Sequence, residues 1–275
     1  MNSIIENFEE YLDSINKNKP LIHHITNYVT VNDCANITLA IGASPVMADA
    51  IEEAQDFAAI ASALVINIGT LNSRTIESMI GAGKNANSVG IPVIFDPVGA
   101  GATLFRNEAT ELILREVKIS VLRGNISEIR YIAGLSANTK GVDASDFDSA
   151  EDAVQIATTL AKRYECIVAI SGATDIVSNG RYTFSVTNGH SSMSRITGTG
   201  CMLASLVASF CGGNPKDLLG STIAASLCMG VAGEIAFEKS GALGNASMRT
   251  TIIDEISKMN ASTIKQRGIV NEIEQ

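Results

Sequence analysis

Short apolar runs alternate with longer segments of helical spacing along most of the chain. The apolar runs are rich in aliphatic residues, end in polar or glycine-containing turns, and lie at 21–25, 63–68, 92–95, 120–122 and 166–170. Helical periodicity is found at 31–41, 51–61, 73–87, 107–116, 126–133 and 149–164. Strands that are apolar on both faces and alternate with helices are typical of a largely parallel sheet covered by helices. The pattern therefore predicts an α/β fold.

The pattern changes in the last third of the chain. Two alternating runs flank Asn179-Gly180 in DIVSNGRYTFSV, which predicts a hairpin and an antiparallel pair at one edge of the sheet. Three helices are expected after it, at 200–211, 216–238 and 248–260. Since the 275 residues contain no internal repeat or linker and suffice for one core, we expect a single domain over 1–275.

Charge and composition narrow the choice of partners and compartment. The formal net charge of −9 argues against nucleic acid or an anionic membrane as a partner, because either favours a basic patch. The five cysteines are widely spaced and lack CxxC pairs, and the N-terminus lacks the basic and apolar regions of a signal peptide. Two uncharged stretches, 196–215 and 218–233, are dotted with Gly, Ser and Thr, which favours buried helices over membrane spans. We expect a cytoplasmic protein.

Polar residues follow the predicted parallel strands. In an open α/β sheet, ligands bind beyond the carboxyl ends of the strands. The residues at these ends include Asn27, Asn67, Asp96, Arg123 and Ser171. One carboxylate, one guanidinium and several small polar groups suit the binding of phosphates and a metal ion.

A glycine-rich segment, Thr197-Gly198-Thr199-Gly200-Cys201, runs directly into an apolar helix. Glycine lets the backbone approach a phosphate closely, and the first N–H groups of a helix form an anion site. The alternative is an ordinary loop before a helix. A Walker A motif is absent from the sequence, so a nucleotide would not be held by a P-loop.

Three residues each allow a chemical and a structural interpretation. Asp96 ends the run IPVIFD and is either a Mg²⁺ ligand or a turn-forming acid before Pro97. Glu128 follows Asn125 by three residues and is either a metal-site acid or the acid of a capping box. Cys201 lies near a helix start, where the helix dipole should favour a thiolate, although a lone cysteine is usually a small buried apolar residue.

Several short segments together resemble one known family. They are PLIHHITNYVTVNDCAN, GASPVMAD, INIGTLN, PVIFDPVGAGAT, RGNISEI, AISGATD and TGTGCMLA, in this order along most of the chain. In sequence and spacing they resemble the hydroxyethylthiazole kinase family, which has the ribokinase-like three-layer α/β/α fold. The resemblance implies ATP as donor, Mg²⁺ as cofactor, 4-methyl-5-(2-hydroxyethyl)thiazole as acceptor and a role in thiamine biosynthesis or salvage. It also implies a homotrimer whose active sites lie between neighbouring subunits.

The same resemblance assigns expected roles to individual residues. By motif, the thiazole-binding positions are Met47 and Gly198, with Asn27 close by, and the ATP-binding positions are Arg123, Ser171 and Gly200. Asp96 and Glu128 resemble the acids that organise Mg²⁺ and the phosphates. Cys201 stands where the wider ribokinase-like group has a catalytic Asp, so it is the candidate catalytic residue and proton acceptor. Ser171 replaces the Thr of many relatives and keeps the hydroxyl.

Other functions are compatible with parts of the pattern. A ribokinase-like kinase acting on a hydroxymethylpyrimidine would share the phosphate-handling residues. A nucleotide-binding regulatory or scaffolding protein would bind ATP without turnover. A nicotinamide-dependent dehydrogenase fits less well, because Gly99-Ala-Gly101-Ala-Thr-Leu104 has Leu at the third glycine position and comes mid-chain.

Overall fold

The computed structural model describes residues 3–135 and 150–274. Within these ranges one sheet has the strand order β2-β1-β3-β4-β5-β6-β7-β8-β9. Neighbouring strands from β2 to β6 are parallel, and the pairs β6–β7, β7–β8 and β8–β9 are antiparallel. The strands are β1 Leu21–Ile25, β2 Ser44–Val46, β3 Ala63–Asn67, β4 Val93–Asp96, β5 Val121–Asn125, β6 Ile167–Ser171, β7 Asp175–Ser178, β8 Thr183–Val186 and β9 Val270–Ile273.

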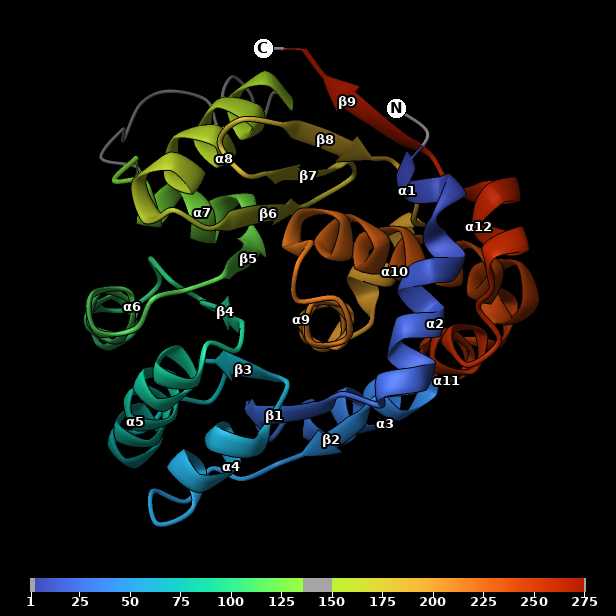
Figure 1. Cartoon of the computed structure of the whole chain (residues 1–275). Helices are drawn as coiled ribbons and strands as arrows, with labels where there is room; N and C mark the ends of the chain where they lie inside the picture. Colours follow the sequence, from blue (N-terminus) through green and yellow to red (C-terminus); the bar gives the residue numbers. More distant parts are fainter. Residues whose placement is uncertain (1–2, 136–149, 275) are drawn as a thin grey trace.

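Helices cover both faces of this sheet (Figure 1). One layer consists of α4 Ala54–Ile60, α5 Ser73–Val89, α6 Leu104–Glu116, α7 Ile126–Ile132 and α8 Ala150–Tyr164. The other layer contains α1 Ser3–Glu6, α2 Phe8–Asn18, α3 Val31–Ala40, α9 Thr199–Gly213, α10 Leu218–Ser240, α11 Asn245–Ile256 and α12 Ala261–Arg267. Alternate strand residues enter the two cores, as Val65 packs on the α9 side and Leu64 and Ile66 on the α5 side. The predicted three-layer α/β/α fold with a largely parallel sheet is confirmed.

Helix α9 is the central helix of its layer. It packs against β1, β3 and β4, and nearly all of its side chains after the first turn are buried. Its first turn consequently lies at the edge of the sheet where the parallel strands end. Among the described residues, only the segment Leu218–Leu243, which consists of α10 and a short 3₁₀ turn, has the length and apolar composition of a membrane-spanning helix. Most of this segment is buried in the core.

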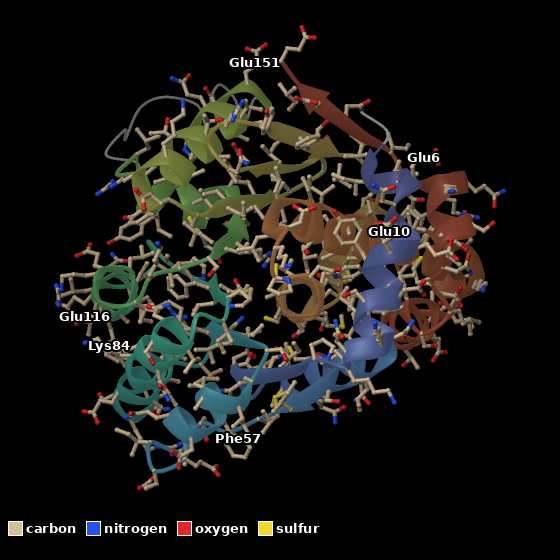
Figure 2. The ribbon with its side chains drawn as sticks, viewed as in Figure 1. Glu6, Glu10, Phe57, Lys84, Glu116 and Glu151 are labelled. Carbon is tan, nitrogen blue, oxygen red and sulfur yellow. The ribbon has the colours of Figure 1, made fainter. Side chains whose placement is uncertain are left out.

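Charged side chains are mostly on the outside of these layers. The labelled acids Glu6, Glu116 and Glu151 lie at the periphery in Figure 2, and Glu10 is exposed on α2. Lys84 on α5 and Glu116 on α6 form an exposed ion pair of 2.7 Å between neighbouring helices. The negative net charge is therefore largely a property of the solvated surface.

Most predicted elements are confirmed to within a few residues, and the hairpin is formed by β7 and β8. Gly180 takes the left-handed φ of 84° in its turn, and Asn179 Oδ1 accepts hydrogen bonds from the N–H groups of Arg181 and Tyr182. The expected start of the 149–164 helix, residue 149, lies outside the described residues.

Other elements differ from expectation. Two edge strands, β2 and β9, and the helices α2 and α12 were not predicted. The expected helix 248–260 is wrong at its end: α11 stops at Ile256, and Asn260 caps the separate helix α12 by accepting a hydrogen bond from the Thr263 N–H.

Candidate active site

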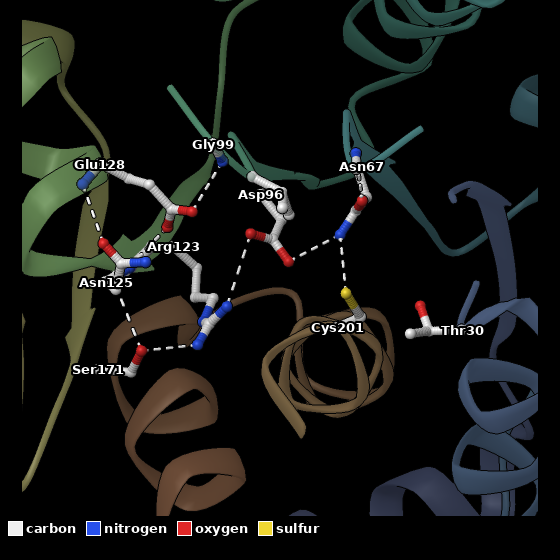
Figure 3. Close-up of polar contacts among 12 residues, drawn as sticks. Thr30, Asn67, Asp96, Gly99, Arg123, Asn125, Glu128, Ser171 and Cys201 are labelled. Atoms are coloured by element: carbon white, nitrogen blue, oxygen red, sulfur yellow. Dashed lines mark hydrogen bonds and ion pairs between the residues drawn. The ribbon is translucent and has the colours of Figure 1, made fainter. Parts of the chain in front are cut away.

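A continuous set of polar contacts crosses the carboxyl ends of the parallel strands (Figure 3). Asn67, the last residue of β3, donates a 2.8 Å hydrogen bond from Nδ2 to Asp96 Oδ2 at the end of β4. Arg123 of β5 places Nη1 3.5 Å from Asp96 Oδ1 and donates from Nη2 to Ser171 Oγ of β6 at 2.6 Å. The structure thus brings together three of the predicted site residues, Asp96, Arg123 and Ser171.

Asp96 is fully buried, and its two oxygens have different surroundings. Oδ2 accepts the bond from Asn67, whereas Oδ1 has no hydrogen-bond partner in the described part of the chain and faces the Arg123 guanidinium. Burial raises the pKa of the Asp96 carboxyl to about 6, although Arg123 opposes this shift and Glu128 adds to it. A buried carboxylate with a free oxygen beside a guanidinium is well suited to binding a phosphate-bound cation.

Glu128 has the contacts of a capping-box acid. Its Oε2 accepts from the Asn125 N–H at 2.8 Å, and Asn125 Oδ1 accepts from the Glu128 N–H at 3.0 Å. The remaining oxygen, Oε1, accepts from the Gly99 N–H at 2.8 Å. Glu128 therefore ties the start of α7 to the turn that follows Asp96.

The glycine-rich segment forms the start of α9, one residue earlier than predicted. Gly198 precedes the helix with a left-handed φ of 91°, and a Cβ built there would come 2.6 Å from Thr30 Cγ2. A Cβ at Gly200 would come 2.6 Å from Arg123 Nη1. Glycine is required at both positions because a side chain would collide with these neighbours. The N–H groups of the first turn of α9, which have no partner within the helix, lie beside the Arg123 guanidinium.

Cys201 lies in the first turn of α9 and is partly buried. Its Sγ accepts hydrogen bonds from Asn27 Nδ2 and Asn67 Nδ2, both at 3.3 Å. Burial raises the pKa of the Cys201 thiol, and the nearby Asp96 carboxylate raises it further. The expectation of a lowered pKa from the helix dipole is wrong, because burial and the charge of Asp96 act in the opposite direction.

A pocket of about 730 Å³ adjoins this cluster. It is bounded by the ends of β5 and β6, the start of α9, the segment 188–194 and one face of α10. Its lining residues include Arg123, Ser171, Gly200, His190, Met193 and Met229. The polar groups at the carboxyl ends of β5 and β6 suit an anionic part of a ligand, and the methionines elsewhere in the lining suit an apolar part.

The remaining predicted residues lie farther along the sheet. Asn27 follows β1 and donates from Nδ2 to Asn67 Oδ1 at 2.9 Å, which connects it to the Asp96 cluster. Met47 follows β2, the edge strand beyond β1, and is partly buried. The strand order separates Met47 from Arg123, so the two lie on different sides of Cys201.

Two residues without a predicted role also shape the site. Asn67 joins Asn27, Asp96 and Cys201, although the sequence marked it only as one of several strand-end residues. Arg106 on α6 donates from its guanidinium to the carbonyl oxygens of Ile68, Gly69 and Val98 and so fixes the turns after β3 and β4. An arginine inside a helical segment gives no sequence signal for this contact.

Comparison with known proteins identifies the family. The model of the hydroxyethylthiazole kinase family matches residues 12–262. The chain belongs to the hydroxyethylthiazole kinase family. The motif resemblance seen in the sequence is thereby confirmed. Since the family consists of kinases, the cluster around Asp96 and Arg123 is the candidate active site of this chain.

Individual relatives of this kinase family extend the match over the full chain. The hydroxyethylthiazole kinase of Ruminiclostridium cellulolyticum is 54% identical over 274 residues, which cover 99% of this chain and 100% of the relative. The solved structure of the hydroxyethylthiazole kinase protein from Pyrococcus horikoshii superposes with a TM-score of 0.89 at 39% identity and covers 100% of both chains. A ribokinase-like superfamily protein from Enterococcus faecalis has a TM-score of 0.64 at 12% identity over 94% of each chain, and it shares the fold alone.

Proposed function

We propose that this protein transfers the γ-phosphoryl group of ATP to the primary hydroxyl of 4-methyl-5-(2-hydroxyethyl)thiazole, in thiamine biosynthesis or salvage. The observation that carries the proposal is the contact of Arg123 with Asp96 directly beside the glycine start of α9. This arrangement gathers a guanidinium, a carboxylate and open backbone N–H groups at one point, which phosphoryl transfer requires for positioning and charge neutralisation.

The donor nucleotide is assigned to the pocket beside Arg123. Its phosphates would meet the Arg123 guanidinium and the N–H groups near Gly200, and the Ser171 hydroxyl holds the guanidinium in place by its 2.6 Å hydrogen bond. The apolar lining at Met193 and Met229 would accommodate the uncharged part of the nucleotide. The role of Ser171 is then to orient Arg123 and to offer a hydroxyl to the phosphates.

The residues present fit Mg²⁺ as the cofactor. Magnesium is usually held by one or two carboxylates together with substrate phosphates and water. Asp96 Oδ1 is a buried carboxylate oxygen without a hydrogen-bond partner in the described residues, and these residues contain no group of three or more His, Cys, Asp or Glu able to hold an ion. Asp96 would supply the protein oxygen, and Glu128 would act by holding the turn at Gly99. When bound, the ion would neutralise charge on the phosphates.

The acceptor is assigned to the side of Cys201 away from Arg123. Met47, Gly198 and Asn27 are the proposed thiazole-binding residues, and Asn27 already contacts Cys201. Cys201 lies between the two assigned subsites, where it could receive the alcohol proton during transfer. Since the transition state is loose, this proton transfer contributes less than positioning does.

Assembly and location complete the proposal. Tyr28 and Val29, next to Asn27, are 79% and 59% exposed, and exposed apolar side chains beside a ligand site favour burial by another subunit. We propose a homotrimer with the active sites at its interfaces, to be checked by light scattering after size-exclusion chromatography. All five cysteines are free thiols, which agrees with the cytoplasm as the proposed compartment.

The decisive test is ADP release with ATP, Mg²⁺ and hydroxyethylthiazole, measured with and without EDTA. We expect thiazole-dependent release that EDTA abolishes and excess Mg²⁺ restores. A parallel reaction with a hydroxymethylpyrimidine tests the related kinase activity. Release with the pyrimidine alone, or ATP binding without turnover for either alcohol, would contradict the proposed function.

A further inference from the structure

His23 is a fully buried side chain in β1, next to the edge strand β2. Its Nε2 lies 2.7 Å from the carbonyl oxygen of Ala48, and its ring packs on Phe57 of α4 with centroids 6.1 Å apart. A carbonyl oxygen only accepts hydrogen bonds, so Nε2 carries the proton and donates. Burial lowers the pKa of His23, which keeps the ring neutral and leaves Nδ1 as an acceptor without a partner among the described residues.

The hydrogen bond from His23 holds a segment with few other anchors. The register between β1 and β2 ends at the pair His23–Val46, and α4 begins only at Ala54. Of residues 47–49, the described hydrogen bonds outside the ladder are those of Ala48 to His23 and of Asp49 to Arg74, and the latter pair is exposed. An exposed ion pair contributes little, so the buried bond from His23 largely fixes where the chain goes after β2.

We propose that His23 is a positioning residue of the acceptor site, because its Nε2–H fixes Ala48 and thereby the adjacent Met47. The proposal rests on the proposed function, in which Met47 and Asn27 bind the thiazole. Strand β1 carries His23 and leads directly into Asn27, so a single strand sets both sides of the acceptor site.

Amide substitutions at His23 test this role. The side-chain nitrogen of His23→Gln can occupy the position of Nε2, whereas that of His23→Asn reaches only the position of Nδ1. We expect His23→Asn and His23→Leu to raise the KM for the thiazole about tenfold, while kcat and the KM for ATP stay within about twofold. His23→Gln should restore the thiazole KM to within about threefold of the wild type, as a retained hydrogen bond predicts.

The control variant is Phe57→Leu, which loosens the same layer but leaves the N–H of His23 in place. It should lower Tm with little change in the thiazole KM. A purely structural role for His23 would lower Tm in all variants and change both KM values together, and this result would overturn the proposal. Equal thiazole KM values for His23→Gln and His23→Asn would overturn it as well, and this comparison stands even if His23→Leu does not fold. Wild-type turnover of the thiazole is measured first, so a failure of the proposed function is seen separately.

Discussion

Replacing Gly198 by alanine should disturb the start of α9 in two separable ways. Its φ of 91° is a conformation in which a side chain costs about 1–2 kcal/mol. The new Cβ would also lie 2.6 Å from Thr30 Cγ2, whereas non-bonded carbons prefer about 3.5–4.0 Å, so one of the two segments must move. We therefore expect a loss of about 2–5 kcal/mol in the free energy of unfolding, as a conformational cost of about 1–2 kcal/mol and an overpacking cost of about 1–3 kcal/mol combine.

The same substitution should reduce catalysis, because Thr30 contacts Asn27 of the proposed acceptor site. Thr30 Oγ1 donates to Asn27 Oδ1 at 3.0 Å, and Asn27 in turn contacts Cys201. A displacement of about 1 Å in such a site can lower activity by about 100-fold, and we expect kcat/KM to fall toward that value. Urea unfolding gives the stability change, and the coupled ADP-release assay gives kcat/KM.

Gly90 provides a matched control for the backbone effect alone. It ends α5 with a φ of 77°, and a Cβ added there meets no atom within 4 Å. Gly90→Ala should cost only about 1 kcal/mol and leave kcat/KM unchanged. In the Gly198→Ala background, Thr30→Ser removes the clashing methyl group and keeps the hydroxyl, so it should recover part of the lost stability. Equal losses for the two glycine variants, with no recovery from Thr30→Ser, would refute the predicted clash.

Three further substitutions test the charges and the buried polar groups of the site. Arg123→Ala should lower kcat/KM by about two orders of magnitude or more, the scale of losing a preorganised charge contact, and near-normal steady-state kinetics would remove Arg123 from the site. Cys201→Asp should leave a working kinase if this position accepts the alcohol proton; complete inactivity with ATP binding and fold intact would contradict that role. His24 is buried with a pKa lowered from 6.5 to about 4 by desolvation, so the unfolded chain binds more protons in this pH range and stability falls as the pH falls from 6.5 toward 4. Between pH 7 and pH 5 this histidine should account for about 2 kcal/mol of lost stability, and His24→Gln should show a correspondingly smaller shift of the urea midpoint between the two pH values.

The sequence predicted the central strands because parallel strands buried on both faces form continuous apolar runs. The run at 63–68 is an example, since every residue of β3 is buried. The edge strands lack this signal. β2 has only three residues and contains Pro45, and β9 reads VNEI with partly exposed side chains. In the chain, β2 is separated from its partner β1 by α3, and β9 is separated from its partner β8 by the helices α9 to α12. The strand conformation of both comes from pairing with these distant partners.

The candidate site was predictable where one rule sufficed and unpredictable where distant segments meet. The rule that ligands bind at the ends of parallel strands selected Asp96, Arg123 and Ser171, and the fold brings these side chains into contact. The local rule for a helix start gave the wrong direction for the pKa of Cys201. That pKa depends on burial and on Asp96, which lies 105 positions earlier in the sequence, and a helix pattern contains neither fact.

The raised pKa values of Asp96 and Cys201 have a common origin and a consequence for catalysis. Asp96 is fully buried and Cys201 is partly buried, and the charge of Asp96 disfavours ionisation of the Cys201 thiol. A thiol that keeps its proton cannot accept one from the alcohol, so in the ligand-free enzyme Cys201 is a poor base. Neutralisation of Asp96 by a cation would remove one of the contributions that raise the pKa of Cys201. In the proposed function the site therefore acts first by charge neutralisation, through Arg123 and a cation held by Asp96, and a role of Cys201 as proton acceptor depends on that cation, in line with the small demand for a base in a loose phosphoryl transfer.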